Sequence, residues 1–370
     1  MSLKTRWQEF KVSMQPRMKE WKFMLKRIKE TPLALAGMVI VIFFVVVALL
    51  APVLAPPPSA DPFLIPKDLE IAKLTTAPTP PTVRHIFGTT EEHYDLYYAC
   101  IWGTITAFRI GVLVVAISLV IGLIIGSLAA YYGGILDEVL MRFTDIIIAF
   151  PGLVLSMALV IAFPTVIPID LTLLLIVGSL LFTFILIAFR PDRRLLILAQ
   201  VILLLSLISH FYYPLIIGLG LTNLDKVLIA ITLVGWPGYT RVIRGEVLRA
   251  KNEDYVEASR AAGSSDFRIM VKHILPNSIY PMLIIATLDI GSIVLLAAAL
   301  SFLGIGAPID YADWGQIISR SMNWISKPDL LIANFHTFFI PGLFITFFVM
   351  GWNLLGDALR DVLDPMMRRR

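Results

Sequence analysis

Charged residues are scarce in this sequence of 370 residues, and cysteine is almost absent. Asp, Glu, Lys and Arg together make up 16% of the residues, whereas soluble domains carry about 25%. Hydrophobic residues make up 58%, and the mean hydropathy is +0.81. These values exclude a soluble globular protein and a disordered chain, and the single cysteine, Cys100, excludes a disulfide-rich secreted domain. The composition predicts an all-α, polytopic integral membrane protein.

Several chemical signatures are also absent. The sequence contains no Gly-Lys dipeptide, so the phosphate-binding loop GxxxxGK[ST] cannot occur. Its five histidines are scattered and form no HExxH or similar pair, which gives no reason to expect a metal site. No Ser/His/Asp or Cys/His arrangement is recognisable. We therefore expect neither an enzyme nor a chain that binds ATP itself.

Long apolar stretches are what the sequence has instead. A helix needs about 20 apolar residues to cross a hydrocarbon core of about 30 Å. About eight stretches qualify: residues 33–55, 110–130, 146–163, 171–189, 195–213, 227–239 with its flanks, 279–303 and 335–355. The first is too long for a signal-peptide core and follows 32 mostly polar residues, so an anchor helix is expected there. Residues 171–189 and 195–213 would form a transmembrane hairpin.

The distribution of basic residues predicts the orientation. Most of the 31 Lys and Arg lie in residues 1–32, 131–145, 190–194, 241–278 and 357–370. This bias places these segments, and both termini, in the cytoplasm. The basic termini then bind the anionic inner leaflet and not nucleic acid. The external segments would be residues 56–107 and 306–334, and the dense proline of the first predicts a loop or small cap without regular helix.

Residues 241–278 are charged and yet carry helix signals. Asp254, with Glu257 three residues later, resembles a capping box, and Gly263 predicts a left-handed helix end. A second short helix is expected over residues 267–273, with Pro276 as its stop. Helices shorter than about 12–15 residues are marginal in water, so a partner surface is expected to hold them. A docking element and an amphipathic loop lying on the bilayer are the two interpretations.

A family resemblance favours the docking element. The pattern Glu257-Ala258-Ser259-x-x-x-Gly263, followed by Leu275-Pro276, resembles the EAA loop of ABC-importer permeases. Ser259 replaces the second Ala of that pattern and His273 replaces an Ile, and residues 272–277 resemble its peptide branch. Further motifs resemble the same subfamily: Tyr131–Gly134, Asp137–Arg142, Phe150-Pro151, Gly235–Tyr239, Leu288–Gly291, Leu300–Gly304, Trp314-Gly315, and Asn353–Asp357 through Asp364-Pro365.

The sequence is thus similar to the second, C-type permease subunit of dipeptide, oligopeptide and nickel importers, from about residue 87 to 365 except roughly 164–222. The resemblance implies a six-helix core plus the extra hairpin, in the plasma or inner membrane. It implies as partners a homologous second permease, two cytoplasmic ATP-binding subunits, an extracellular solute-binding protein and the lipid bilayer. ATP and Mg would be bound by the ATP-binding subunits and no cofactor by this chain. The candidate docking residues are Tyr255, Val256, Glu257, Ala258, Ser259, Gly263, Leu275 and Pro276.

The expected organisation follows from spans and resemblance together. Its parts are a cytoplasmic segment 1–32, an anchor helix 33–55, an external loop 56–107, a permease domain 108–365 with an inserted hairpin 164–222 and a coupling loop 241–278, and a basic tail 366–370. The family's Phe-Gly-Thr-Asp-x-x-Gly-Arg-Asp segment reads here as residues 87–95, with its Asp, Gly and Arg replaced. The chain therefore departs most from the family's pattern on its predicted external face.

Asp289 is the one acid deep within a predicted span. A central Asp costs about 2.5–3.5 kcal/mol on insertion scales, so it should face protein or water. It is a candidate for lining the pathway, and a hydrogen bond to a neighbouring helix is the alternative. The alternative function is an ion-coupled secondary transporter, which would carry several intramembrane ionisable residues and often inverted repeats. The sequence displays neither.

Overall fold

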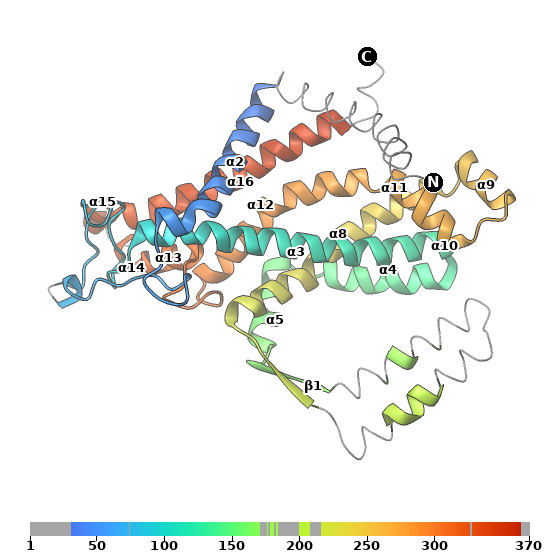
Figure 1. Cartoon of the computed structure of the whole chain (residues 1–370), viewed down its shortest axis with the longest axis horizontal. Coiled ribbons are helices and arrows are strands. Elements are labelled where there is room, and N and C mark those ends of the chain that lie inside the picture. The colour runs from blue at the N-terminus through green and yellow to red at the C-terminus, as the bar shows by residue number, and fades with distance from the viewer. Residues whose placement is uncertain are drawn as a thin grey trace, which may run out of the picture. The chain divides into compact units, whose positions relative to one another are not determined.

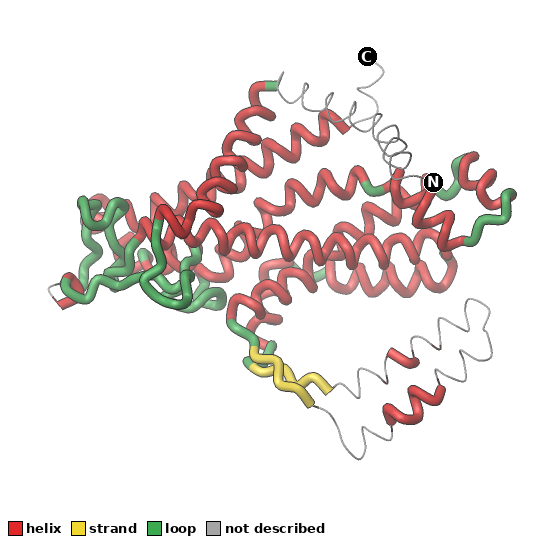
Figure 2. The backbone as a smooth tube through the Cα atoms, in the orientation of Figure 1, coloured by secondary structure: helices red, strands yellow, loops and turns green. Residues whose placement is uncertain are grey.

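The computed structural model describes residues 31–73, 75–170, 176, 178–180, 183, 200–207, 216–325 and 328–363. These residues are overwhelmingly helical, as Figure 2 shows, and they include long apolar helices. Both features confirm the predicted all-α membrane class. The chain divides into two compact units, one of Met1–Val160 with Val227–Arg370 and one of Ile161–Lys226.

The helices are labelled in Figure 1. In chain order they are α2 (Pro32–Leu54), α3 (Leu96–Tyr132), α4 (Gly134–Ile148), α5 (Gly152–Ala162), α8 (Asn223–Ala250), α9 (Asp254–Ala261), α10 (Asp266–Ile269), α11 (Leu275–Ser278), α12 (Tyr280–Phe302), α13 (Trp314–Arg320), α14 (Met322–Ile325), α15 (Pro328–Asn334) and α16 (His336–Leu363). A 3₁₀ turn, Ile71–Lys73, lies between α2 and α3, and a π-helical turn, Met270–Ile274, lies between α10 and α11.

Within the described ranges, α2, α3, α12 and α16 are long and apolar enough to cross a membrane. They contain the predicted span 110–130 and, except for one or two end residues, the predicted spans 33–55, 279–303 and 335–355. The predicted span 227–239 lies within α8, which is not among the four because charged residues occur at both of its ends. Most residues of the predicted spans 171–189 and 195–213 lie outside the described residues.

The predicted span over residues 146–163 is not one continuous helix. Helix α4 begins much earlier, at Gly134, and ends at Ile148, and α5 follows at Gly152 after a bend of 90°. Pro151 lies at this break, and a proline disfavours helical backbone in the residue before it. The pair is therefore either one broken span or a re-entrant segment, and counting it as a span raises the number to five.

The helices of the first unit cross closely where glycine replaces a side chain. Helix α16 packs against α2 and α12, and α12 packs against α3. A Cβ atom at Gly37 would lie 2.6 Å from the Leu354 Cβ, and one at Gly291 would lie 3.2 Å from the Val349 Cα. Close approach of backbones through small residues is the usual way in which membrane helices gain contact area, because lipid supplies no hydrophobic drive between them.

Helix α3 has 37 residues and is about 55 Å long at 1.5 Å per residue, far longer than a bilayer core. It begins at Leu96, so the expectation that residues 56–107 contain no regular helix is wrong for residues 96–107. The prolines of that segment all lie at or before Pro81, and nothing prevents a helix beyond them. Asp95 caps α3 by accepting a 2.8 Å hydrogen bond from the Tyr98 N–H.

The second unit contains the only strands among the described residues. Strand β1 (Val166–Asp170) pairs antiparallel with β2 (Ile216–Gly220), with Val166 opposite Gly220 and Asp170 opposite Ile216. Neither strand was predicted, because the sequence there reads as a continuation of apolar spans. Most of the residues between the two strands lie outside the described residues.

Candidate functional site

The predicted coupling loop lies between α8 and α12. In Figure 1, α9 and α10 lie at one end of α3, and α13 to α15 lie at the other. The charged start of the loop, residues 241–250, is the last part of α8. The free part of the loop therefore begins at Lys251.

Helix α9 begins differently from the prediction. Asp254 is already the first helical residue, and Glu253 precedes it as N-cap without a side-chain hydrogen bond. The predicted capping box of Asp254 and Glu257 is therefore wrong. Both carboxylates instead lie in the first turn, where the positive end of the helix dipole favours them.

The end of α9 is as predicted. Gly263 has a φ of +77°, which is the left-handed conformation that glycine adopts without strain. The Ser264 N–H donates to the Ser259 carbonyl at 3.2 Å, and the Gly263 N–H donates to the Arg260 carbonyl at 3.0 Å. These two bonds form a Schellman motif, which satisfies carbonyls that the helix end would otherwise leave free.

The second short helix does not stop at Pro276. Helix α10 leads into the π-helical turn, which leads into α11, and α11 is followed almost directly by α12. Pro276 is the second residue of α11. A proline within a helix removes one hydrogen bond and crowds the carbonyl four residues earlier. The π turn immediately before α11 widens the backbone there, so the chain continues as helix.

Most of the predicted docking residues are open to contact. On α9, Tyr255, Glu257 and Ala258 are exposed, Ser259 is half-buried, and Val256 is fully buried. Gly263 is exposed directly after α9. Leu275 is half-buried and Pro276 exposed, but both lie on α11. The structure thus brings Tyr255 to Gly263 together as one small surface, and Val256 is the fully buried residue beneath it.

Ion pairs that the sequence did not reveal hold α8 to α4. The Arg244 guanidinium donates two 2.6 Å hydrogen bonds to the Asp137 carboxylate, and Arg241 donates one of 2.7 Å to Asp145. A bidentate pair such as Arg244 and Asp137 fixes the relative orientation of the two side chains in addition to the charge attraction. The spacing of three between Arg241 and Arg244 puts them on one face of a helix, but their acids lie about a hundred positions earlier.

One residue at the end of α3 contacts both ends of the segment that contains α9. The Lys251 ammonium donates to the Tyr131 carbonyl at 2.6 Å, and the Tyr131 hydroxyl donates to the Asp266 carboxylate at 2.6 Å. Lys251 also lies 5.6 Å from the centre of the Tyr131 ring. The sequence motif Tyr131–Gly134 contains this tyrosine, but no role was predicted for it.

Asp289 is half-buried on α12, beside Tyr239 of α8. Tyr239 is 2% exposed, and its hydroxyl has no hydrogen-bond partner within the described part of the chain. The role of Asp289 in the pathway stays a prediction. Among the described residues, no group of three or more His, Cys, Asp or Glu side chains has the geometry to hold a metal ion.

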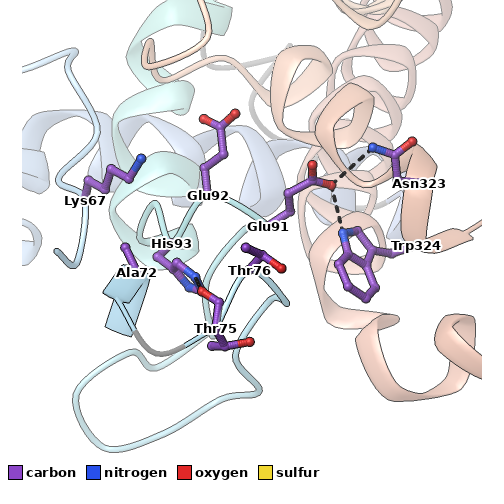
Figure 3. Close-up of a pocket in the computed structure, with 9 residues that line it drawn as sticks. All are labelled: Lys67, Ala72, Thr75, Thr76, Glu91, Glu92, His93, Asn323 and Trp324. Carbon is purple, nitrogen blue, oxygen red and sulfur yellow. Dashed lines mark hydrogen bonds between the residues drawn. The ribbon is translucent and has the colours of Figure 1, made fainter. Parts of the chain in front are cut away.

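The segment that departs from the family pattern, residues 87–95, lines a cavity of about 370 Å³ (Figure 3). His93 stands where the pattern has glycine, and its φ of +63° is in the left-handed region. The ring is 2% exposed and its Nε2 lies 2.6 Å from the Thr75 carbonyl, which anchors the residue. Across the cavity, the Trp324 indole donates a 2.8 Å hydrogen bond to Glu91. His93 thus adopts a backbone conformation that is typical of glycine.

A charged cluster fixes the base of this segment, which the sequence predicts to be external. The two ring nitrogens of buried His85 lie 2.7 Å from Asp95 and 3.1 Å from Asp68. The pKa of the Asp68 carboxyl is lowered, because the Ile71 N–H and His85 hydrogen-bond to its ionised form. Since Asp95 also caps α3, the cluster joins the external segment to the start of the longest helix.

Comparison with known proteins identifies relatives along most of the chain. The family model described as "Binding-protein-dependent transport system inner membrane component" matches residues 118–369, and the model "N-terminal TM domain of oligopeptide transport permease C" matches residues 19–72. The dipeptide transport system permease protein DppC of Bacillus subtilis is 29% identical over 93% of this chain and 85% of its own length. The oligopeptide transport system permease protein OppC of the same organism is 29% identical over 94% and 90%. The probable D,D-dipeptide transport system permease protein DdpC of Escherichia coli is 30% identical over 91% and 89%.

Proposed function

The chain belongs to the family of binding-protein-dependent transport system inner membrane components, and from this premise we propose how it works. It is a multi-pass membrane permease subunit of an ABC transport system. We propose that it forms half of the translocation pathway of an importer. We further propose that α9 is the helix on which the ATP-binding subunits dock and which they move. Those subunits bind ATP and Mg, and this chain hydrolyses nothing and holds no cofactor of its own.

One observation carries this proposal: α9 is an exposed two-turn helix, and Val256 is its one fully buried residue. So short a helix is not stable by itself in water. Ala258, Ser259 and Gly263 give it a surface of small side chains on which another protein can approach the backbone closely. Tyr255 is the large side chain on this surface and Glu257 a charged one.

The proposed assembly follows from the family. It contains a homologous second permease, two cytoplasmic ATP-binding subunits and an extracellular solute-binding protein. The bias of basic residues supports cytoplasmic termini and a cytoplasmic α9. The segment around His85 and the cavity near His93 then face the solute-binding protein, since Asp95 contacts His85 and caps the start of α3, and α9 lies at the other end of that helix (Figure 1).

The proposed substrates are short peptides. The relatives named above are dipeptide, oligopeptide and D,D-dipeptide permeases. The proposed pathway includes the region near Asp289, which lies beside Tyr239 within the helix bundle. The carboxylate contacts a neighbouring helix there and is not exposed to lipid alone, as its insertion cost requires.

Substitutions of Gly263 test the coupling role. The position has φ +77°, and a Cβ atom there would meet nothing within 4 Å, so backbone strain is the main local effect. A left-handed β-branched residue is strained by about 1–2 kcal/mol, whereas asparagine tolerates this conformation. In the assembled transporter in proteoliposomes, Gly263→Val is expected to lower ATP-driven uptake of a labelled alanine tripeptide severalfold while ATP hydrolysis continues.

The matched control is Gly263→Asn, which should transport nearly as well as the unmodified chain. Uptake should stop with vanadate in every case. Normal uptake by Gly263→Val would show that the end of α9 is not part of the coupling surface.

A further inference from the structure

Tyr131 is placed so that it joins a membrane helix to the loop that carries α9. It is the last residue but one of α3, and it is 5% exposed. Lys251 comes directly after α8, and Asp266 is the first residue of α10. The segment between them contains all of α9, and each of its ends is bonded to the same tyrosine.

The bonds use different atoms of Tyr131 and are all short. Its carbonyl accepts from the Lys251 ammonium at 2.6 Å, and its hydroxyl donates to Asp266 at 2.6 Å. The Lys251 ammonium also lies 3.5 Å from the Ala130 carbonyl. Arg260 of α9 itself lies beside the Tyr131 hydroxyl. Bonds to charged groups are stronger than neutral ones, so this residue closes the segment at its base.

The other contacts of α9 are too few to pass a movement of this helix on to the membrane helices. Val256 is the only residue of α9 that is fully buried, and segments with few buried contacts open locally at low cost. A push on such a helix would be absorbed by bending of its two connections. With both connections held on α3, the push reaches a helix that packs against α12.

We propose that Tyr131 is a positioning residue that clamps the coupling segment, residues 251–266, onto α3. Movement of α9 by the ATP-binding subunits is thereby passed to α3 and not lost in the loop. The clamp rests on the proposed coupling role of α9 and names the residue through which that role reaches the membrane helices.

The test is Tyr131→Phe in the assembled transporter, because this change removes one hydroxyl and keeps the ring and the carbonyl. The matched control is Tyr280→Phe, an exposed tyrosine at the start of α12. Loss of a hydrogen bond to a charged group should raise the open fraction of the segment about tenfold or more. Amide hydrogen exchange in residues 251–266 should accelerate by the same factor in Tyr131→Phe only.

A second measurement, the amount of peptide transported per ATP, distinguishes a clamp from a purely structural role of Tyr131. Tyr131→Phe should still bind the ATP-binding subunits and hydrolyse ATP, but should transport several times less labelled alanine tripeptide per ATP. Asp266→Asn combined with Tyr131→Phe should be no worse than Tyr131→Phe alone, because the hydroxyl that donates to position 266 is already absent. Unchanged exchange together with an unchanged ratio of peptide to ATP would overturn the clamp.

Failure of the clamp differs from failure of the coupling role. If Gly263→Val uncouples transport and Tyr131→Phe does not, α9 is the docking element and Tyr131 only a packing residue. If Gly263→Val transports normally, the coupling role itself is wrong, whatever Tyr131→Phe does.

Discussion

Gly122 and Gly126 are spaced four apart on α3 and face α8, so one added methyl group at this contact has a predictable effect. A Cβ atom at Gly126 would lie 2.2 Å from the Ile243 Cγ2 and 2.5 Å from the Thr240 carbonyl oxygen. Ordinary contact begins near 3.4 Å. The Thr240 oxygen is backbone and cannot rotate away, so Gly126→Ala requires the two helices to separate by about 1 Å.

The magnitude follows from two opposing effects. Overpacking of this kind costs about 1–3 kcal/mol. Alanine in place of glycine within a helix stabilises the folded chain by about 0.5–1 kcal/mol. Gly245 of α8 is the matched control, because a Cβ atom there meets nothing within 4 Å and only the second effect applies. The control should therefore be more stable than Gly126→Ala by about 1–3 kcal/mol.

The assay is thermal unfolding of the full chain in one detergent, followed by tryptophan fluorescence. A difference of about 1–3 kcal/mol corresponds to a shift of a few degrees in melting temperature, since domains of about 150–250 residues shift by about 2–4 °C per kcal/mol. Gly126→Ala should unfold below the unmodified chain and Gly245→Ala at or above it. If Gly126→Ala is as stable as Gly245→Ala, the close crossing of α3 and α8 is refuted.

Substitutions of three further acidic residues test other parts of the structure. The pKa of Asp68 is lowered in the fold, so its stabilisation is present above its unfolded pKa of about 3.9 and is lost as the pH falls further. Asp68→Asn should therefore unfold earlier than the unmodified chain at pH 7, with a difference that shrinks below about pH 4. Burial raises the pKa of Asp313, the N-cap of α13, so the unmodified chain gains stability as the pH falls towards that pKa. Asp313→Asn should match or exceed it in melting temperature at pH 7, whereas Asp313→Ala should lose about 1 kcal/mol of capping. Asp289→Asn should keep normal peptide uptake, because an amide can also lie beside Tyr239; a large loss of uptake would instead show that transport needs the charge.

Local patterns predicted the parts of this fold that depend on local chemistry. The apolar runs of α2, α12 and α16 were recognisable because crossing a bilayer requires length and hydropathy alone. Gly263 was recognisable as a helix end because few residues tolerate its backbone conformation. The resemblance to the EAA loop singled out the segment that contains α9, and the docking role of this segment stays a prediction.

The features that local patterns did not predict depend on tertiary contacts. The early start of α4 is invisible in hydropathy because its polar side pairs with α8, through Arg244 and Asp137. Pro276 reads as a helix stop in any local rule, and a π turn upstream removes the conflict. The clamp at Tyr131 joins residues 120 and 135 positions apart, which no local pattern of the sequence links.

Contact between α9 and an ATP-binding subunit is the central claim, and site-specific cross-linking measures it most directly. Ala258→Cys places an exposed thiol on α9, and the natural Cys100 is buried. Ser59→Cys, in the exposed external segment, is the control. After labelling with a benzophenone maleimide in the assembled transporter, illumination should join position 258 to an ATP-binding subunit and position 59 to none. Absence of a product from position 258, or the same product from position 59, would contradict the account.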